Sequence, residues 1–330
     1  MKRIVVFAIA LSAAALSGCA TPSASGLEAV TGALFVANKR GNSLSKIDLA
    51  SGREVARVDA CANPHELATS PDGRLVALAC YGGTSVDVFR TADLSQAKRI
   101  ELGENARPHG IVWHRNGDLY ATAEGRRSVF WIRDPLGRAE LFEYGTGKEG
   151  SHMLAVAPDA RHAWTTDLGS RTVTRVDLKT RRAPQSVEVG VEPEGIALSP
   201  DGGTLWVSAR GSDKAFALDP QTLEVRREVA TGDFPIRIAV RPQGDVAVTS
   251  DLEDGALTVI GMATARVLRT IPVSGSREPF QVTILWSPDG GRIYVAETAN
   301  DTVAEVDYAS GRVLRRLKAG AGGDGLAIID

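Results

Sequence analysis

The 330-residue chain has little of several features that would decide its class at once. Its three cysteines are too few for a disulfide-built scaffold, and aromatic residues make up only 5%. Acidic and basic residues nearly cancel, giving a formal charge of −2, so the chain lacks the positive surplus with which proteins bind nucleic acid. With 43% hydrophobic and 24% charged residues, it is an ordinary globular chain rather than a disordered one.

The chain also lacks a hydrophobic run that could span a bilayer, which takes about 20 residues. Its longest apolar run covers residues 4–16 and follows Lys2 and Arg3, an arrangement typical of a secretory signal. The run ends in Leu16-Ser17-Gly18-Cys19, which resembles the lipobox of bacterial lipoproteins. That resemblance implies cleavage before Cys19 and lipidation of its thiol. Secretion after a different cleavage site is the alternative.

These features predict three segments. We expect a lipoprotein signal peptide over 1–18, a lipidated tether over 19–32, and a single folded domain over 33–330. Ala20 stands where an aspartate would follow the cysteine, which by resemblance to enterobacterial-type sorting implies an outer-membrane lipoprotein that faces the periplasm. The membrane is then contacted through the lipid alone, and we expect a monomer.

One pattern recurs along the whole folded domain, and it ends in an apolar residue about every 43 positions. Its copies are Pro-His-Glu-Leu at 64–67, Pro-His-Gly-Ile at 108–111, Ser-His-Met-Leu at 151–154, Pro-Glu-Gly-Ile at 193–196, Pro-Ile-Arg-Ile at 235–238, Pro-Phe-Gln-Val at 279–282 and Asp-Gly-Leu at 324–326. A second marker follows in phase, for example Ser-Pro-Asp-Gly at 70–73, 199–202 and 287–290. Two markers in phase establish an internal repeat.

Each repeat reads as four short strands separated by polar turns, and no window after the signal shows a helical period. Four strands in about forty residues are typical of a propeller blade. Residues 33–60 supply three strands and residues 325–329 supply one, so the two ends together complete a seventh blade. We therefore predict an all-β, seven-bladed propeller of antiparallel blades, closed by the C-terminal strand, which leaves no open sheet edge.

Three short segments carry a family resemblance. Val-Ala-Asn at 36–38, Ser-Pro-Asp-Gly at 199–202 and Thr-Ile-Pro-Val at 270–273 resemble the YVTN repeats of bacterial seven-bladed propellers such as the YncE-like proteins. The resemblance implies the same fold over nearly the whole mature chain. It does not imply one function, because this architecture carries binding modules, hydrolases, lyases and quinoproteins.

The repeat predicts which side chains gather at one mouth of the central channel, because the first strand of a blade starts and the second ends at the same rim. At the start we expect His65, His109, His152, Glu194, Ile236, Phe280 and Asp324. At the end we expect Asn38, Cys80, Glu124, Asp167, Arg210, Asp251 and Glu297. Three of only five histidines thus share one repeat position in consecutive blades.

Several functions fit this mouth. Imidazoles from neighbouring strands suit a divalent metal, with His65, His109 and His152 as ligands. His109 and Glu124, within one blade, suit general acid–base catalysis. The histidines could equally cap backbone groups of the adjoining blade.

We rank first a small-molecule or protein ligand held at this mouth by His65, His109, His152, Glu194, Asp167, Arg210, Asp251 and Glu297. The second reading is a metal-assisted lyase or lactonase, since Pro-His-Gly-Ile at 108–111 resembles repeats of streptogramin lyase, which uses a metal and a His/Glu pair. This chain has Gly125-Arg126 where a second histidine would follow Glu124. A redox role of the quinoprotein type is third, and no motif for its cofactor is present.

The two remaining cysteines form an even pair in an oxidising compartment. Cys61 lies before the Pro64-His65 loop and Cys80 at the end of the second strand of the same blade. Both positions fall near one rim, so a Cys61–Cys80 disulfide that fixes the His65 loop is favoured over two free thiols.

Overall fold

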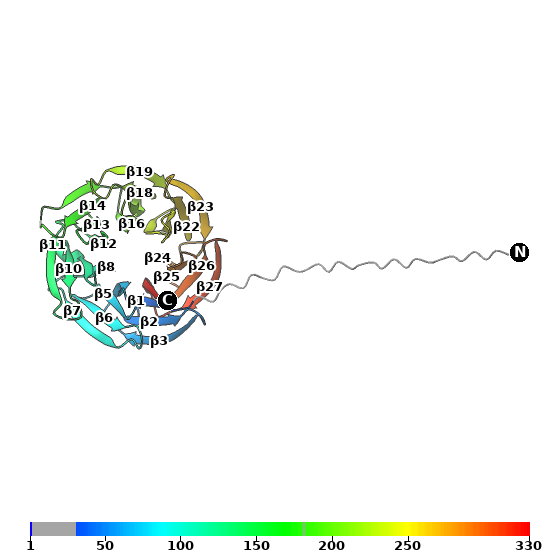
Figure 1. Ribbon diagram of the computed structural model, residues 1–330, viewed down its shortest axis with the longest axis horizontal. Coiled ribbons are helices and arrows are strands. Elements are labelled where there is room, and N and C mark those ends of the chain that lie inside the picture. The colour runs from blue at the N-terminus through cyan, green and yellow to red at the C-terminus, as the bar shows by residue number, and fades with distance from the viewer. Residues whose placement is uncertain (2–30, 181) are drawn as a thin grey trace.

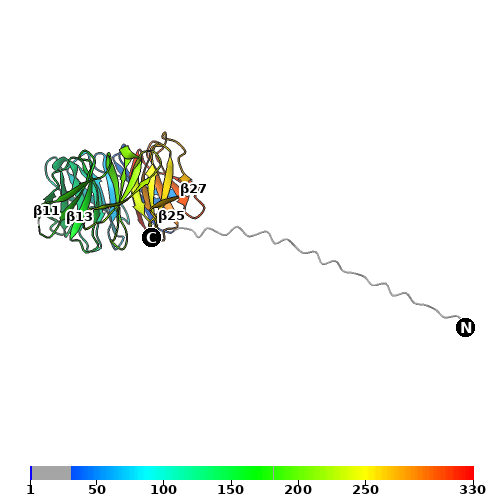
Figure 2. The same cartoon turned by 90° about the horizontal axis from the view of Figure 1, so that it is seen from above.

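The computed structural model describes Met1, residues 31–180 and residues 182–330. In this part of the chain, seven four-stranded antiparallel sheets stand as blades around a central axis (Figures 1 and 2). The seven-bladed all-β propeller predicted from the repeat is confirmed. We number the blades 1–7 in chain order, starting from the one that holds the first strand. The signal peptide, Cys19 and most of the tether lie outside the described residues, and none of the described helices is long and apolar enough to cross a membrane.

Each blade has an inner, a second, a third and an outer strand. The inner strands of blades 1–7 are β28 (Gly323–Ile329), β4 (Pro64–Thr69), β8 (Pro108–Trp113), β12 (Ser151–Val156), β16 (Pro193–Leu198), β20 (Pro235–Val240) and β24 (Gln281–Trp286). The second strands are β1 (Ala33–Asn38), β5 (Leu75–Cys80), β9 (Leu119–Ala123), β13 (His162–Asp167), β17 (Leu205–Ala209), β21 (Val246–Asp251) and β25 (Arg292–Glu297).

The third strands are β2 (Ser43–Asp48), β6 (Ser85–Arg90), β10 (Ser128–Arg133), β14 (Thr172–Asp177), β18 (Lys214–Leu218), β22 (Ala256–Gly261) and β26 (Thr302–Asp307). The outer strands are β3 (Arg53–Asp59), β7 (Gln96–Glu101), β11 (Glu140–Gly145), β15 (Gln185–Glu188), β19 (Val225–Ala230), β23 (Arg266–Pro272) and β27 (Arg312–Lys318). Two short 3-10 helices, η1 (Glu124–Arg126) and η2 (Arg210–Ser212), follow the second strands of blades 3 and 5.

The ring closes in blade 1. Its inner strand β28 comes from the C-terminal end of the chain and pairs antiparallel with β1, with Ala33 opposite Ile329 and Asn38 opposite Gly323. This is the closure predicted from the three-strand start and one-strand finish. Because the C-terminal strand occupies the inner position of blade 1, both sheet edges that an open array would expose are covered.

Blade 7 corrects one detail of the repeat. In β24, Gln281 lies opposite Glu297 and Ile284 opposite Val295, so Ile284 is the equivalent of Leu67. The sequence pattern had assigned that place to Val282. The connection before β24 covers residues 273–280, whereas residues 231–234 suffice before β20, and the longer loop carries a Pro279-Phe280 pair that imitates the start of the repeat. Phe280 therefore lies in the loop, and Val282 takes the position predicted for it.

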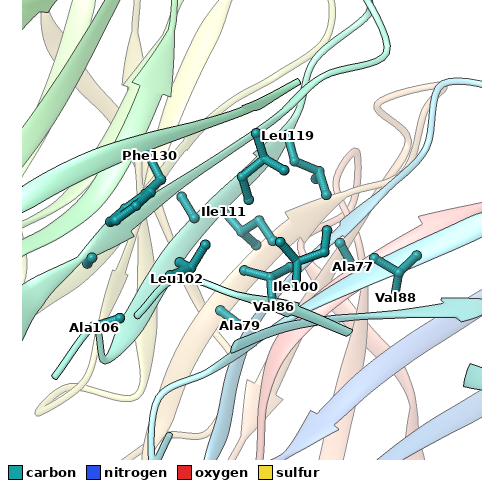
Figure 3. Packing of buried hydrophobic residues seen from close by; sticks show 13 residues of the cluster. Ala77, Ala79, Val86, Val88, Ile100, Leu102, Ala106, Ile111, Leu119 and Phe130 are labelled. Carbon is teal, nitrogen blue, oxygen red and sulfur yellow. The ribbon is translucent and has the colours of Figure 1, made fainter. Parts of the chain in front are cut away.

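The blades are held together by apolar side chains that fill the space between neighbouring sheets. Figure 3 shows this packing between blades 2 and 3, where Val86, Ile100 and Leu102 meet Ile111 and Phe130. All five are at least nine-tenths buried. Burial of such a side chain contributes about 1.5–3 kcal/mol. The outer strands, by contrast, alternate between exposed and half-buried residues, as β3 does.

Candidate functional site

Two consecutive residue positions at the end of each second strand face in opposite directions, because side chains alternate along a strand. The last strand residue turns into the blade, and the residue after it turns to the channel mouth. The residues that follow the second strands of blades 1–7 are Lys39, Tyr81, Glu124, Leu168, Arg210, Leu252 and Thr298. The second residues of the inner strands are His65, His109, His152, Glu194, Ile236, Val282 and, in blade 1, Asp324. These two rings form the mouth.

The structure brings the three predicted histidines together. The ring centroids of His109 and His152 are 3.6 Å apart, and those of His65 and His109 are 4.8 Å apart. The ring of Tyr81 lies against the same group, 4.5 Å from His65 and 5.4 Å from His109. Four aromatic rings from blades 2, 3 and 4 therefore pack against one another at tilted or edge-on angles, with His109 in the middle and almost completely buried.

The glycine of Pro-His-Gly-Ile allows this packing. A Cβ on Gly110 would lie 2.8 Å from the carbonyl oxygen of His152, so only glycine lets the inner strand of blade 4 approach so closely. The Thr122 hydroxyl of blade 3 then donates to that same carbonyl at 2.6 Å. Gly325 has the same role in blade 1, since a Cβ there would meet the carbonyl oxygen of His65 at 2.0 Å. The close approach of neighbouring strands fixes the distance between their side chains at the mouth.

The acid–base pair at the mouth is not the one predicted. The carboxylate of Glu124 accepts a hydrogen bond from Nδ1 of His152 in the next blade, and not from His109 in its own. Its other oxygen accepts from the Tyr81 hydroxyl at 2.8 Å, and Arg107 donates to that hydroxyl in turn. On the far side of the imidazole, Nε2 of His152 lies 3.3 Å from Oε1 of Glu194. His152 is thus held between two carboxylates from blades 3 and 5.

These contacts shift the pKa values of His152 and His109 in opposite directions. Burial opposes the charged form of His152, but the contacts with Glu124 and Glu194 outweigh burial and raise its pKa. Burial lowers the pKa of His109 well below its ordinary value, and the neighbouring His152 charge lowers it further. The Nδ1 atom of His109 is buried and has no hydrogen-bond partner among the described residues. His109 therefore loses its proton at a lower pH than the adjacent His152.

Arg237 is the functional residue that the sequence prediction missed. From the inner strand of blade 6 its guanidinium donates to Oε1 of Glu194 in blade 5, at 2.5 Å, and to Oε1 of Glu66 in blade 2, at 2.9 Å. Both partners, like Arg237 itself, are almost completely buried. The contact with Glu66 crosses the ring and joins blades that are not neighbours. The signal was present in the repeat, where Pro-Ile-Arg-Ile and Pro-His-Glu-Leu carry charge one position after the predicted site.

The charges on Arg237 and Arg210 explain the acidity of Glu194. Burial would raise the pKa of its carboxyl, but His152, Arg237 and Arg210 together lower it to about 2. On the other side of the ring, Nζ of Lys39 lies 2.9 Å from Oδ2 of Asp324. Each acid at the mouth therefore has a cationic partner.

The structure does not bring Asp167, Asp251 and Glu297 to the mouth, which corrects their predicted place there. Each is the last residue of its second strand and has no exposed surface. Each forms hydrogen bonds or an ion pair with side chains of its own blade. Asp167 accepts hydrogen bonds from four hydroxyls, and Asp251 accepts from Thr249 and Thr258. Glu297 pairs with Arg316 at 2.9 Å. Glu124 and Arg210 differ because alanine ends their strands and the polar residue comes one position later.

The three histidines as placed do not form a metal site. Among the described residues, the only three His, Cys, Asp or Glu ligand atoms within 4.8 Å of one another belong to Cys61, Cys80 and Asp87. The two sulfurs of that group are joined in a disulfide, so they are not free ligands. The imidazole rings of neighbouring histidines pack against each other at tilts of 32° and 55°, and one nitrogen of His152 is committed to Glu124. A transition metal needs convergent nitrogens.

A disulfide supports the loop that carries His65. Cys61 and Cys80 are bonded, with their Cα atoms 5.6 Å apart, and this is the pairing that the sequence predicts. The bond ties the start of blade 2 to the end of its second strand, next to Tyr81. His65 is further held by its Nδ1, which lies 3.0 Å from the carbonyl oxygen of Asn63.

Comparison with known proteins identifies the fold and not a family. No family model matches the chain, and no curated protein sequence does. A functionally unknown protein from Desulfotomaculum acetoxidans DSM 771 superposes with a TM-score of 0.77 at 12% identity, over 90% of this chain and 99% of that one.

Two lyase structures are also similar. A streptogramin B lyase has a TM-score of 0.68 at 16% identity, covering 80% of this chain and 87% of its own. A catalytically inactive virginiamycin B lyase from Staphylococcus aureus with quinupristin has a TM-score of 0.66 at 17% identity, covering 82% and 93%. At these identities the likeness concerns the propeller fold alone.

Proposed function

We propose that this protein is a YncE-like propeller that binds a small ligand at the histidine mouth. The observation that carries the proposal is His109. Its Nδ1 is buried at the centre of the ring cluster with no hydrogen-bond partner among the described residues, and leaving a buried polar atom unpaired costs about 1–3 kcal/mol. Trp206 and Trp286 also carry an unpaired buried nitrogen, but they lie in the apolar packing between blades, whereas His109 lies at the channel mouth. A ligand that hydrogen-bonds to this imidazole, or displaces a neighbouring ring to reach it, would recover that cost.

We further propose that the chain is lipid-anchored at Cys19 and faces the periplasm from the outer membrane. Ala33 pairs with Ile329 at the end of blade 1 that lies opposite the mouth, where Gly73 of a Ser-Pro-Asp-Gly turn also packs on Ile329. A tether that precedes Ala33 therefore joins the ring at the rim opposite the histidines. An anchor there would leave the mouth directed away from the membrane and open to soluble ligands.

The proposal is tested by a thermal-shift screen of purified protein without a tag against a library of small acids, amines, sugars and dipeptides. We expect some compounds to raise the melting temperature of the wild type and to lose this effect in His109→Ala. His162→Ala is the matched control, because His162 begins β13 at the opposite rim. Compounds that stabilise His109→Ala as well as the wild type would place binding elsewhere and contradict the proposal.

A lyase or lactonase that uses the same mouth is the second candidate. It is favoured by the opposite pKa shifts of His109, which is lowered, and of His152 beside Glu124, which is raised, since a proton acceptor and a proton donor can then lie within one cluster. The test is incubation with a cyclic depsipeptide lactone, followed by mass spectrometry. Hydrolysis adds the mass of water and elimination opens the ring without a change in mass. Turnover that disappears in His109→Ala, with no metal in the purified protein, would favour this candidate over simple binding.

A further inference from the structure

The mouth has a polar arc and an apolar arc. Blades 1–5 supply the histidines and, apart from the buried Arg237 of blade 6, the charges described above. Blades 6 and 7 supply instead a separate hydrophobic cluster, which we call the apolar arc and which consists of Ile236, Leu252, Val282, Phe234 and Phe280. Ile236 and Val282 occupy the same repeat position as the histidines, so the apolar arc belongs to the same ring of residues. The two phenylalanines are only partly buried, so part of each ring reaches the mouth.

The two phenylalanines stand where the backbone does not favour them. The residue before the inner strand has a left-handed backbone in all seven blades, at Asn63, Arg107, Gly150, Glu192, Phe234, Phe280 and Gly322. Glycine and asparagine suit this conformation, while bulky side chains are disfavoured in it. Phe234 and Phe280 have φ values of 60° and 54°. Aromatic rings at the mouth are thus present in two adjacent blades against the local backbone preference.

Three cations at the mouth reach solvent. The side chains of Arg210 and Lys39 are 25% and 24% exposed, whereas their partners Glu194 and Asp324 are 4% and 2% exposed. Arg107 is also exposed. Glu192 is an exposed acid at the same rim, since it lies 3.2 Å from Arg210 and its side chain is 45% exposed. An approaching ligand therefore meets the ammonium of Lys39 and the guanidinium groups of Arg107 and Arg210, the last beside the carboxylate of Glu192.

The cations flank the apolar arc on both sides. Arg210 belongs to blade 5, next to blade 6, and its guanidinium carbon lies 5.0 Å from the ring centroid of Phe234. Lys39 belongs to blade 1, next to blade 7. An apolar surface and a cation consequently meet at each boundary between the two arcs. Guanidinium groups bind carboxylates with two parallel hydrogen bonds, which gives both strength and direction.

We infer that the mouth binds a small amphipathic carboxylate, whose apolar or aromatic group packs on Phe234 and Phe280 and whose carboxylate pairs with Arg210 or Lys39. This inference rests on the proposed function, since it names the class of ligand for the same mouth. The buried acids at the mouth attract a cationic ligand less than the exposed cations attract an anionic one, because solvent-facing charge is what an incoming ligand contacts first.

The test uses 3-phenylpropionate as the probe, with 3-phenylpropanol and acetate as matched compounds that lack the charge or the ring. Binding to the full folded domain is measured by NMR or calorimetric titration. We expect 3-phenylpropionate to bind about tenfold more tightly than either matched compound. The variants are Arg210→Gln and the double change Phe234→Asn with Phe280→Asn, in which asparagine suits the left-handed backbone and so keeps the loops folded. Each should weaken the probe about tenfold, and Val55→Asn on the exposed outer strand β3 should not.

The outcomes separate the two proposals. If 3-phenylpropionate binds no better than 3-phenylpropanol, or if the phenylalanine and arginine variants bind it like the wild type, the inferred ligand class is wrong. If compounds of another class bind in a way that depends on His109, the ligand class is likewise wrong while the histidine mouth stands as a binding site. If no compound of any class depends on His109, the proposed function fails together with the inference.

Discussion

Two kinds of buried carboxylate occur near the mouth, some turned into a blade and some turned to the channel, and they behave in opposite ways. Asp167 and Asp251 turn into the blade and accept hydrogen bonds from threonine and serine hydroxyls, and burial raises their pKa, that of Asp251 to about 6. Glu124 and Glu194 at the mouth have cationic partners from other blades, and their pKa values are lowered in spite of burial.

The difference shows that the kind of partner sets the direction in which the pKa of a buried carboxylate is shifted. Hydroxyl donors satisfy the oxygens of a carboxylate but bring no positive charge, so they offset only part of the cost of burying a negative charge. Arginine and protonated histidine supply the charge. The carboxylates in the blades thus hold one sheet together, while those at the mouth join different blades to one another.

The largest expected effect comes from removing the cation that the mouth acids share. Arg237→Met leaves Glu66 and Glu194 buried without this partner, and breaking a buried ion pair from one side costs about 3–5 kcal/mol. The loss in the free energy of unfolding is measured by urea unfolding. Lys214→Met is the control, since the Lys214–Glu228 pair is about half exposed and contributes about 0–1 kcal/mol. Equal losses in the two variants would mean that the contact across the ring does not hold the blades.

A direct comparison of the two kinds of carboxylate should give the next largest difference. Glu194→Gln leaves Arg237 and Arg210 short of negative charge, and we expect it to lower the free energy of unfolding by about 2–4 kcal/mol. Asp167→Asn keeps the shape and removes a poorly compensated charge, so we expect a change of about 1 kcal/mol or less. Both are measured at pH 7 by urea unfolding. A greater loss in Asp167→Asn would reverse the comparison.

The two kinds of acid should also respond to pH with opposite signs. The pKa of Glu194 is lowered from 4.5 to about 2, so its stabilisation is present above pH 4.5 and is lost as the pH falls towards 2. The pKa of Asp251 is raised from 3.8 to about 6, so the folded state holds a proton that the unfolded chain has released, and stability falls as the pH rises from about 4 to 6.

Asp251→Asn isolates the second effect. Across pH 4 to 6 we expect this variant to become steadily more stable relative to the wild type, because it has no proton to lose. The measurement is the difference between the two free energies of unfolding at each pH. A difference that stays constant over that range would show that Asp251 is ionised in the folded protein as readily as in the unfolded one.

The smallest signal is spectroscopic and concerns the packed imidazoles. Long-range ¹H–¹⁵N spectra recorded across a pH titration should show that His109 loses its proton at a lower pH than His152, since their pKa values are shifted in opposite directions. In Glu124→Gln, His152 should lose its proton at a lower pH than in the wild type, and His109 should remain neutral. Two imidazoles that titrate together near their ordinary value would remove the distinction between them.

The sequence was sufficient for the fold because repetition averages out local ambiguity. Seven copies of a pattern near 43 residues indicated strand order, blade number and closure, even though each strand alone is short. The one register error, at Val282, arose where an inserted loop copied the start of the motif. The disulfide between Cys61 and Cys80 could also be predicted from the sequence, since both residues fall at one rim of one blade.

The site was harder to predict, because it depends on side-chain direction at single-residue resolution. Glu124 and Asp167 look equivalent in the repeat, yet a shift by one position along a strand reverses the face on which each lies. The pair formed by Arg237 and Glu66 is separated by 171 residues and crosses the ring, so no local spacing signals it. Arg237 and Glu66 each come one residue after the repeat position that was predicted for the site. This similarity points to a contact between them only once the closed ring is known to place their blades across the channel from each other.

Ring closure has a consequence for the order in which the chain folds. β1 lies near the start of the domain, but its inner neighbour β28 lies at the far end of the domain, with Val36 opposite Leu326. Blades 2–7 are built from contiguous sequence and can form as soon as each is complete, whereas blade 1 must wait for β28. Closing so long a loop is entropically costly and slow. Until that step, the inner edge of β1 and Asp324's partner Lys39 remain unpaired, so the histidine mouth is complete only when β28 is in place.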